Sequence, residues 1–162
     1  MPEERGETMK LYHGSNIQIG VIDLSLSKPN KDFGCAFYLS PNLDQAKEMA
    51  DFKAELLGGT DVVTEFEIDS FDGLRVKSFD SYSEEWAHFV FEHRTEPHGN
   101  TLHDFDVVYG PIANDGIGAQ ITRFKQGYIT FAEFLERIKY IKGITFQYAF
   151  CTQKAIDRLK KI

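Results

Sequence analysis

Short strand-type segments alternate with helical segments along this chain, and this alternation limits the folds that it can adopt. Residues 61–69 alternate apolar and polar side chains, which is typical of a half-buried strand. After Pro41 and Asn42, apolar residues recur at helical spacing as far as Gly58, which predicts a helix. Because the strands are short and widely spread, we expect a mixed α+β fold, with residues 1–8 as a flexible N-terminus and residues 9–162 as a single domain.

The same signals predict the remaining elements. Further strands are expected at Met9–His13, Gly34–Ser40, Leu74–Phe79, Phe105–Tyr109 and Ile144–Cys151. Further helices are expected after Ser83, after Asn114 or Asp115, over Thr130–Tyr140 and over the closing segment Gln153–Ile162. We expect the strand at Leu74–Phe79 to pair with residues 61–69.

Charge and cysteine content argue against several classes of protein. The net charge of −7 and pI of about 5.2 argue against a duplex-DNA binder, which needs a basic face to displace counterions. The two cysteines, Cys35 and Cys151, are too few and too far apart for a disulfide framework or a zinc site. His98 and His103 have irregular spacing in a polar loop, so no metal is expected. Without a secretory signal or a run of about 18 apolar residues, we expect a cytoplasmic protein with no membrane partner.

Three segments carry polar residues at strand positions where a purely apolar core would not need them. His13 ends a strand before Gly14, where a missing side chain can let a flat ligand approach the backbone. Tyr38 and its neighbour Phe37 face opposite sides of a strand, so one can pack in the core while the other lines a cleft. Gln147 lies among apolar residues and needs either internal hydrogen-bond partners or a pocket. Taken singly, each residue has an ordinary structural explanation as well as a functional one.

The order of these segments is more specific than any of them alone. The chain carries Tyr12-His13-Gly14-Ser15, then Asp32–Pro41 (DFGCAFYLSP) leading into an Ala-rich helix, then Phe105–Asp115 (FDVVYGPIAND), and finally Thr152, Lys154 and Ala155. In this order the four strings resemble the ADP-ribosyltransferase superfamily and, more narrowly, the bacterial family catalogued as domain of unknown function 3990. The resemblance spans residues 10–159.

The resemblance implies a fold and a ligand. The fold would be two split antiparallel β-sheets around a cleft for NAD, with flanking helices, and NAD would be a substrate used without a metal. His13 would hold the adenosine ribose, the Gly14 backbone would bind the nicotinamide carboxamide, and Tyr38 would stack on the nicotinamide ring. Ser15 and Ser40 would contribute to the same site, and Gln147 would take the third position of the family triad, near the nicotinamide ribose.

The implied activity is NAD-dependent mono-ADP-ribosylation of a macromolecular acceptor, in the setting of a toxin or effector; whether it has a cognate antitoxin stays open. Gln147 departs from the glutamate common at the third position and cannot act as a general base. An NAD glycohydrolase and an inactive module that binds a nucleotide or a partner therefore stay open as alternatives. Four further residues are candidates for substrate or phosphate contacts, although a cap, turn or ion pair would also explain them: Asp32, Arg94, Asn114 and Asp115.

Overall fold

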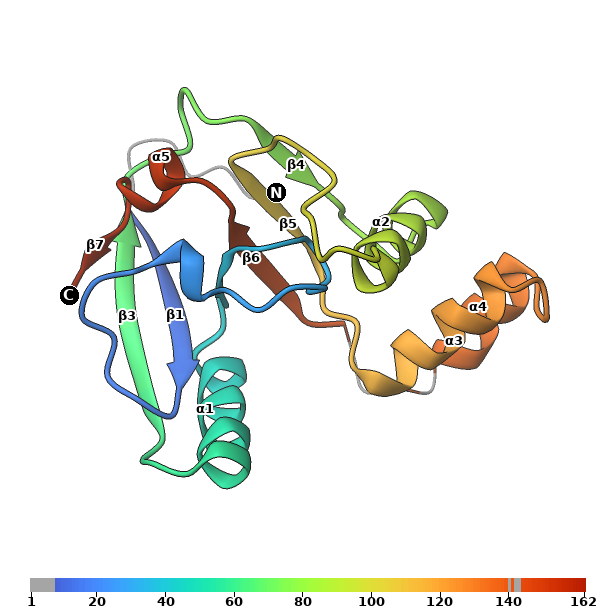
Figure 1. Ribbon diagram of the computed structural model, residues 1–162, viewed down its shortest axis with the longest axis horizontal. Coiled ribbons are helices and arrows are strands. Elements are labelled where there is room, and N and C mark those ends of the chain that lie inside the picture. The colour runs from blue at the N-terminus through green and yellow to red at the C-terminus, as the bar shows by residue number, and fades with distance from the viewer. Residues whose placement is uncertain (1–7, 140, 142–143) are drawn as a thin grey trace.

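Two β-sheets and five α-helices make up the computed structural model, which describes residues 8–139, 141 and 144–162 (Figure 1). The three-stranded sheet has the order β1 (Met9–Ser15), β3 (Val62–Ile68), β7 (Lys160–Lys161). The four-stranded sheet has the order β2 (Phe37–Leu39), β6 (Phe146–Phe150), β5 (Val107–Pro111), β4 (Val76–Ser78). The predicted α+β class is confirmed, whereas the flexible terminus predicted at residues 1–8 lies, apart from Thr8, outside the described residues.

The helices are α1 (Leu43–Leu57), α2 (Glu84–Thr95), α3 (Asp115–Lys125), α4 (Phe131–Ile138) and the short α5 (Gln153–Ile156). Each begins after a side chain that accepts a hydrogen bond from a free N–H of the first turn; these capping residues are Asn42, Ser83, Asn114, Thr130 and Thr152. In Figure 1, α1 lies beside β1 and β3, while α3 and α4 project together from the opposite end of the molecule. Within the described residues, none of these helices has the length and hydropathy needed to cross a membrane.

One predicted strand pairing, the expected strand direction and one predicted helix differ from the structure. The predicted helix Gln153–Ile162 ends at Ile156, and the chain then returns to β3 as the two-residue strand β7. The Arg158 guanidinium, which donates hydrogen bonds to the carbonyls of Ser70 and Asp72, anchors that return. Strand β4 pairs with β5 rather than with β3, and the pairing is parallel, unlike the antiparallel pairing expected throughout. Helix α2 connects β4 to β5, and such a crossover is what lets consecutive strands run parallel.

The side-chain alternation of β2 and β6 separates two hydrophobic cores. The first core lies between the four-stranded sheet and helices α2, α3 and α4, and its largest buried side chains include Trp86 and Phe134. The second core lies between the two sheets and includes Leu11, Phe66 and Tyr148. Successive residues of a strand point to opposite faces, so β2 and β6 supply side chains to both cores.

Candidate functional site

Strands β1 and β2 touch at one point and then separate. Tyr12 and Ser40 exchange two main-chain hydrogen bonds of 2.8 Å, and this isolated bridge is the junction between the two sheets. In an antiparallel ladder the main-chain groups that face a given neighbour recur at every second residue. The N–H and C=O of Gly14 therefore point toward β2, as those of Tyr12 do. The ladder between β1 and β2 does not continue to Gly14. We call the main chain of Gly14 and of Tyr38 at this position the open edge.

His13 lies at the open edge in a defined chemical form. Its Nδ1 is 2.7 Å from the main-chain oxygen of Tyr38, and because a carbonyl can only accept, Nδ1 carries the hydrogen. Burial lowers the pKa of His13 to about 4, an effect that the nearby Lys53 charge reinforces and the bond to Tyr38 partly offsets. At neutral pH the ring is thus uncharged, and its Nε2 offers a lone pair to a hydroxyl donor. The ring also stacks on Phe37, with 4.2 Å between ring centroids.

The Tyr38 side chain lies on the other face of β2. Phe37 packs against the second core, whereas the Tyr38 ring packs against the first. The Tyr38 hydroxyl donates to the carbonyl of Gly34 at 2.6 Å and accepts from the N–H of Phe33 at 3.1 Å. Burial is the main reason that the pKa of this phenol is raised well above 10. The structure therefore brings the His13 ring to the Tyr38 backbone, while the Tyr38 ring is held by the loop before its own strand.

Gly14 is buried under helix α1. A side-chain carbon at this position would lie 2.1 Å from the Ala46 oxygen and 2.8 Å from the Ala50 nitrogen, both in the α1 backbone. The close approach of β1 to α1 is thus a packing reason for this glycine, in addition to any ligand contact. On the same side, Lys53 of α1 donates to the Gly14 oxygen at 3.0 Å. Burial first, and then the charges of Lys31 and Lys28, lower the pKa of Lys53 to about 8.

Lys53 is the residue of this site that the sequence prediction missed. It lies seven residues after Ala46 and three after Ala50, and both alanines are buried against the sheet. A lysine on the buried side of a helix is unusual, and this spacing could have identified it. Because Lys28 and Lys31 belong to the loop between β1 and β2, their proximity to Lys53 depends on the tertiary structure.

Ser40 forms the bridge with Tyr12, Ser15 follows Gly14, and Gln147 comes two residues before Ala149, the β6 partner of Tyr38, on the face opposite the His13 ring. Gln147 is half-buried and pairs with Gly110, on the same face of the sheet as Tyr38. Within the described residues its side-chain amide has no hydrogen-bond partner. Ser40 is buried, and its hydroxyl closes the turn before α1 by contacts of 3.0 Å with the main chain of Asn42. Ser15 is buried at the end of β1, and its oxygen accepts a long bond of 3.4 Å from the N–H of Ile17.

Asp32 and Arg94 form an ion pair with each other. The Arg94 Nε donates to an Asp32 oxygen at 2.7 Å, and a second Arg94 nitrogen donates to the carbonyl of Ala113. The other Asp32 oxygen accepts from the N–H of Ala113 at 3.3 Å. These contacts tie the loop before β2 to the connection between β5 and α3. Their predicted role as substrate or phosphate contacts stays a prediction.

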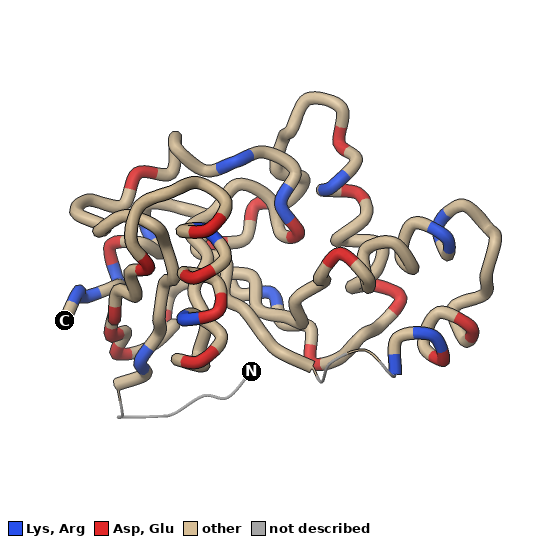
Figure 2. Tube along the Cα trace, turned by 90° about the horizontal axis from the view of Figure 1, so that it is seen from below, with Lys and Arg blue, Asp and Glu red and all other residues tan. Residues whose placement is uncertain are grey.

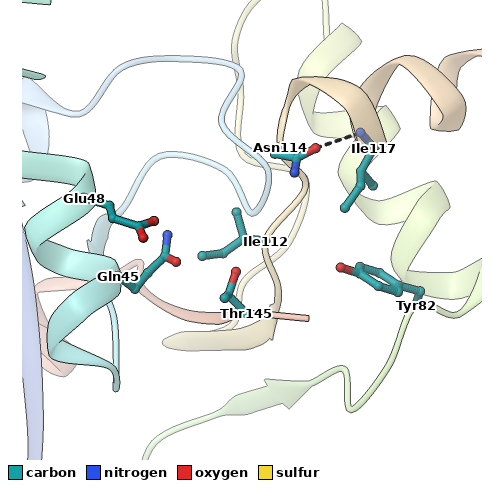
Figure 3. Close-up of a pocket in the computed structure, with 7 residues that line it drawn as sticks. All are labelled: Gln45, Glu48, Tyr82, Ile112, Asn114, Ile117 and Thr145. Atoms are coloured by element: carbon teal, nitrogen blue, oxygen red, sulfur yellow. Dashed lines mark hydrogen bonds between the residues drawn. The ribbon is translucent and has the colours of Figure 1, made fainter. Parts of the chain in front are cut away.

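Asn114 takes part in a separate cavity of about 210 Å³ (Figure 3). Its side-chain oxygen caps α3 by accepting from the N–H of Ile117 at 2.9 Å, and Asp115 occupies the first turn of that helix. The other lining residues come from α1, from the segment before α2, from the ends of β5 and α3, and from the segment before β6; they are Gln45, Glu48, Tyr82, Ile112, Ile117 and Thr145. His13, Tyr38 and Gln147 are not part of this lining, so the cavity is distinct from the open edge.

The residue types that bind metals are also present in the described part of the chain. No group of three or more His, Cys, Asp and Glu side chains there has the arrangement to hold a metal ion. His103 contacts the Phe33 carbonyl at 2.8 Å and accepts from the N–H of Phe105 at 3.0 Å, so both of its nitrogens have protein partners. Cys35 and Cys151 are both free thiols and are half-buried.

Comparisons with known proteins identify a family for this chain. A search of curated proteins and a search of solved structures each found no match. A family model described as "Protein of unknown function (DUF3990)" matches residues 9–161, which includes all seven strands and all five helices named above. The chain therefore belongs to the DUF3990 family.

Proposed function

We propose that this protein is an NAD-dependent mono-ADP-ribosyltransferase of the ADP-ribosyltransferase superfamily, which modifies a macromolecular acceptor. The observation that carries the proposal is the open edge: β1 and β2 separate after a single bridge, next to a neutral histidine. The Gly14 main chain presents an N–H and a C=O there, the pair of groups that a carboxamide can bond in return. In the proposed complex the nicotinamide carboxamide binds at this place.

The charges around the open edge suit a dinucleotide. Lys28, Lys31 and Lys53 lie near enough to one another to lower the pKa of Lys53, in a chain whose net charge is −7. Lys53 is half-buried and bonds a neutral carbonyl, so an anionic diphosphate would be a stronger partner for it. In the proposed complex Lys53 turns from the Gly14 oxygen to the diphosphate and frees that oxygen for the carboxamide. Binding of NAD should then weaken as the pH rises and Lys53 loses its proton.

The proposed reaction breaks the bond between the ribose C1′ and the nicotinamide nitrogen. Nicotinamide leaves with the electron pair of that bond, positive charge develops on the ribose, and an acceptor nucleophile bonds to C1′ and releases its proton to solvent or to a base of its own. The neutral Nε2 of His13 would accept a hydrogen bond from the adenosine ribose, and Gln147 would orient the nicotinamide ribose without taking a proton. The Tyr38 ring lies on the face of β2 opposite Phe37, on which the His13 ring stacks, so its stacking on the nicotinamide would require β2 to move as well as the Gly34 loop that bonds its hydroxyl.

A binding module without turnover is the second candidate, and Gln147 is the observation that favours it. An amide cannot serve as a general base, so a site of this kind can keep its affinity for NAD while transferring ADP-ribose poorly or not at all. Hydrolysis of NAD without an acceptor is a further outcome that the same experiment separates.

Purified protein incubated with NAD labelled in the adenine, together with cell lysate, tests the proposal. We expect nicotinamide release and label transferred to a macromolecule, with both lost in His13→Gln, Tyr38→Ala and Gln147→Ala. His98→Gln, at an exposed loop position, is the matched control and should keep full activity. Free ADP-ribose alone would indicate a glycohydrolase. NAD binding by calorimetry without release would indicate the binding module. No binding and no release would refute the assignment of this site.

A further inference from the structure

Helix α1 packs its small side chains against the sheet and leaves its large apolar ones in solvent. Ala46 and Ala50 are 2% and 1% exposed, whereas Met49, Phe52 and Leu56 are 40%, 59% and 67% exposed. The close approach of β1 at Gly14 leaves no room for large residues on the buried side. Positions 49, 52 and 56 are separated by three and four residues, so their side chains share one face of the helix. We call this set the apolar stripe.

A row of carboxylates runs beside the apolar stripe. Asp44, Asp51 and Glu55 are exposed and are spaced by seven and four residues, which places them along one side of α1 next to the stripe. The exposed Lys47 lies between Asp44 and Asp51 on this side, which keeps a net negative charge. Asp61, in the segment between α1 and β3, shares a hydrogen bond with Asp51, and together with the Glu55 charge this contact raises the pKa of Asp51. Figure 2 colours the Lys and Arg positions blue and the Asp and Glu positions red along the chain. Asp51, Glu55 and Asp61 repel one another, and a cationic partner would relieve that repulsion.

We propose that the exposed face of α1 binds another protein through an amphipathic helix with basic flanks. The apolar stripe offers anchors at the spacing that one helix presents to another. The 15 residues of α1 are about 22 Å long, enough for a pairing over four turns. The carboxylate row determines the charge expected beside the partner's apolar residues. Lysines or arginines there would be attracted to the carboxylates, and glutamates would be repelled by them. A second copy of this chain would bring the same carboxylates together, so self-association is disfavoured.

The test uses two synthetic helical peptides of 16 residues that share four leucines at helix-face spacing. One carries lysines beside the leucines and the other carries glutamates at the same positions. In fluorescence anisotropy at low salt we expect the lysine peptide to bind about tenfold or more tightly than the glutamate peptide. The preference should shrink as salt is added, because exposed charge pairs are screened.

Variants of the full chain locate the binding. Phe52→Ser should abolish binding, and Asp51→Asn with Glu55→Gln should reduce the preference for lysine while leaving the apolar contact. Val21→Ser, at a 93% exposed position outside α1, is the matched control. Equal binding of both peptides, binding that survives Phe52→Ser, or no binding would overturn the proposal. Self-association by sedimentation that is lost in Phe52→Ser would also overturn it, in favour of a second copy. None of these outcomes depends on NAD turnover.

Discussion

The replacement Gly14→Ala tests how closely β1 is seated on α1. The added carbon would lie 2.1 Å from the Ala46 oxygen, 1.3 Å short of the 3.4 Å at which ordinary contact begins. The nearest atoms belong to helix backbone, so no side chain can turn aside, and α1 as a whole must move away from the sheet. Overpacking usually costs 1–3 kcal/mol and sometimes more, and a backbone clash belongs at the upper end, at about 3 kcal/mol.

The measurement is urea unfolding at neutral pH, followed by the fluorescence of the single tryptophan, Trp86, and by circular dichroism. A loss of about 3 kcal/mol corresponds to a melting temperature lower by about 6–12 °C in a chain of this size. Gly20→Ala is the matched control, because an added carbon there meets nothing within 4 Å. It should change the free energy of unfolding by about 0.5 kcal/mol or less. If both variants unfold within about 0.5 kcal/mol of each other, the packing argument for Gly14 is wrong.

Two further predictions concern buried charge. The pKa of His13 is about 4 in the folded chain and 6.5 in the unfolded chain. Between these pH values His13 binds a proton only in the unfolded chain, so the free energy of unfolding decreases as the pH is lowered from 6.5 to 4. In urea titrations the free energy of unfolding should decrease by about 3 kcal/mol between pH 7 and pH 4 because of His13. His13→Gln should remove this decrease and the His98→Gln control should keep it. The same pH dependence in both variants would contradict the low pKa of His13. Arg94→Met leaves the Asp32 carboxylate, 12% exposed, without its cation and should cost about 3 kcal/mol. Arg123→Met, at an exposed position of α3, is the control, and equal stability of the two arginine variants would show that the ion pair is dispensable.

Local chemistry explains where the sequence predictions succeeded. Asn42, Ser83 and Thr130 were recognisable as helix starts because a capping side chain bonds the N–H groups of its own first turn. The alternation of residues 61–69 likewise identified β3, since one face of that strand packs in the second core. The family strings were also local, and the match over residues 9–161 confirms the narrower of the two resemblances, to the DUF3990 family.

Contacts distant in sequence explain where these predictions failed or had no signal. A segment such as 76–78 alternates in the same way whether it pairs with β3 or with β5, and the crossover through α2 decides between them. Lys160 and Lys161 form a strand only because β3 offers them a free edge. Lys53 reaches the Gly14 carbonyl, and the Tyr38 hydroxyl is bonded by its own preceding loop, only after the sheets and α1 have packed.

The sequence by itself determined which segments become helices and strands in most of the chain and which family the chain resembles, because caps, periodicity and motif strings act over a few residues. The tertiary structure alone decided which strands are neighbours, which lysines lie near Lys53, and which face of α1 is exposed. Those features depend on how closely two backbones can approach each other, as Gly14 and Ala46 show. That distance cannot be predicted from any short segment of the sequence.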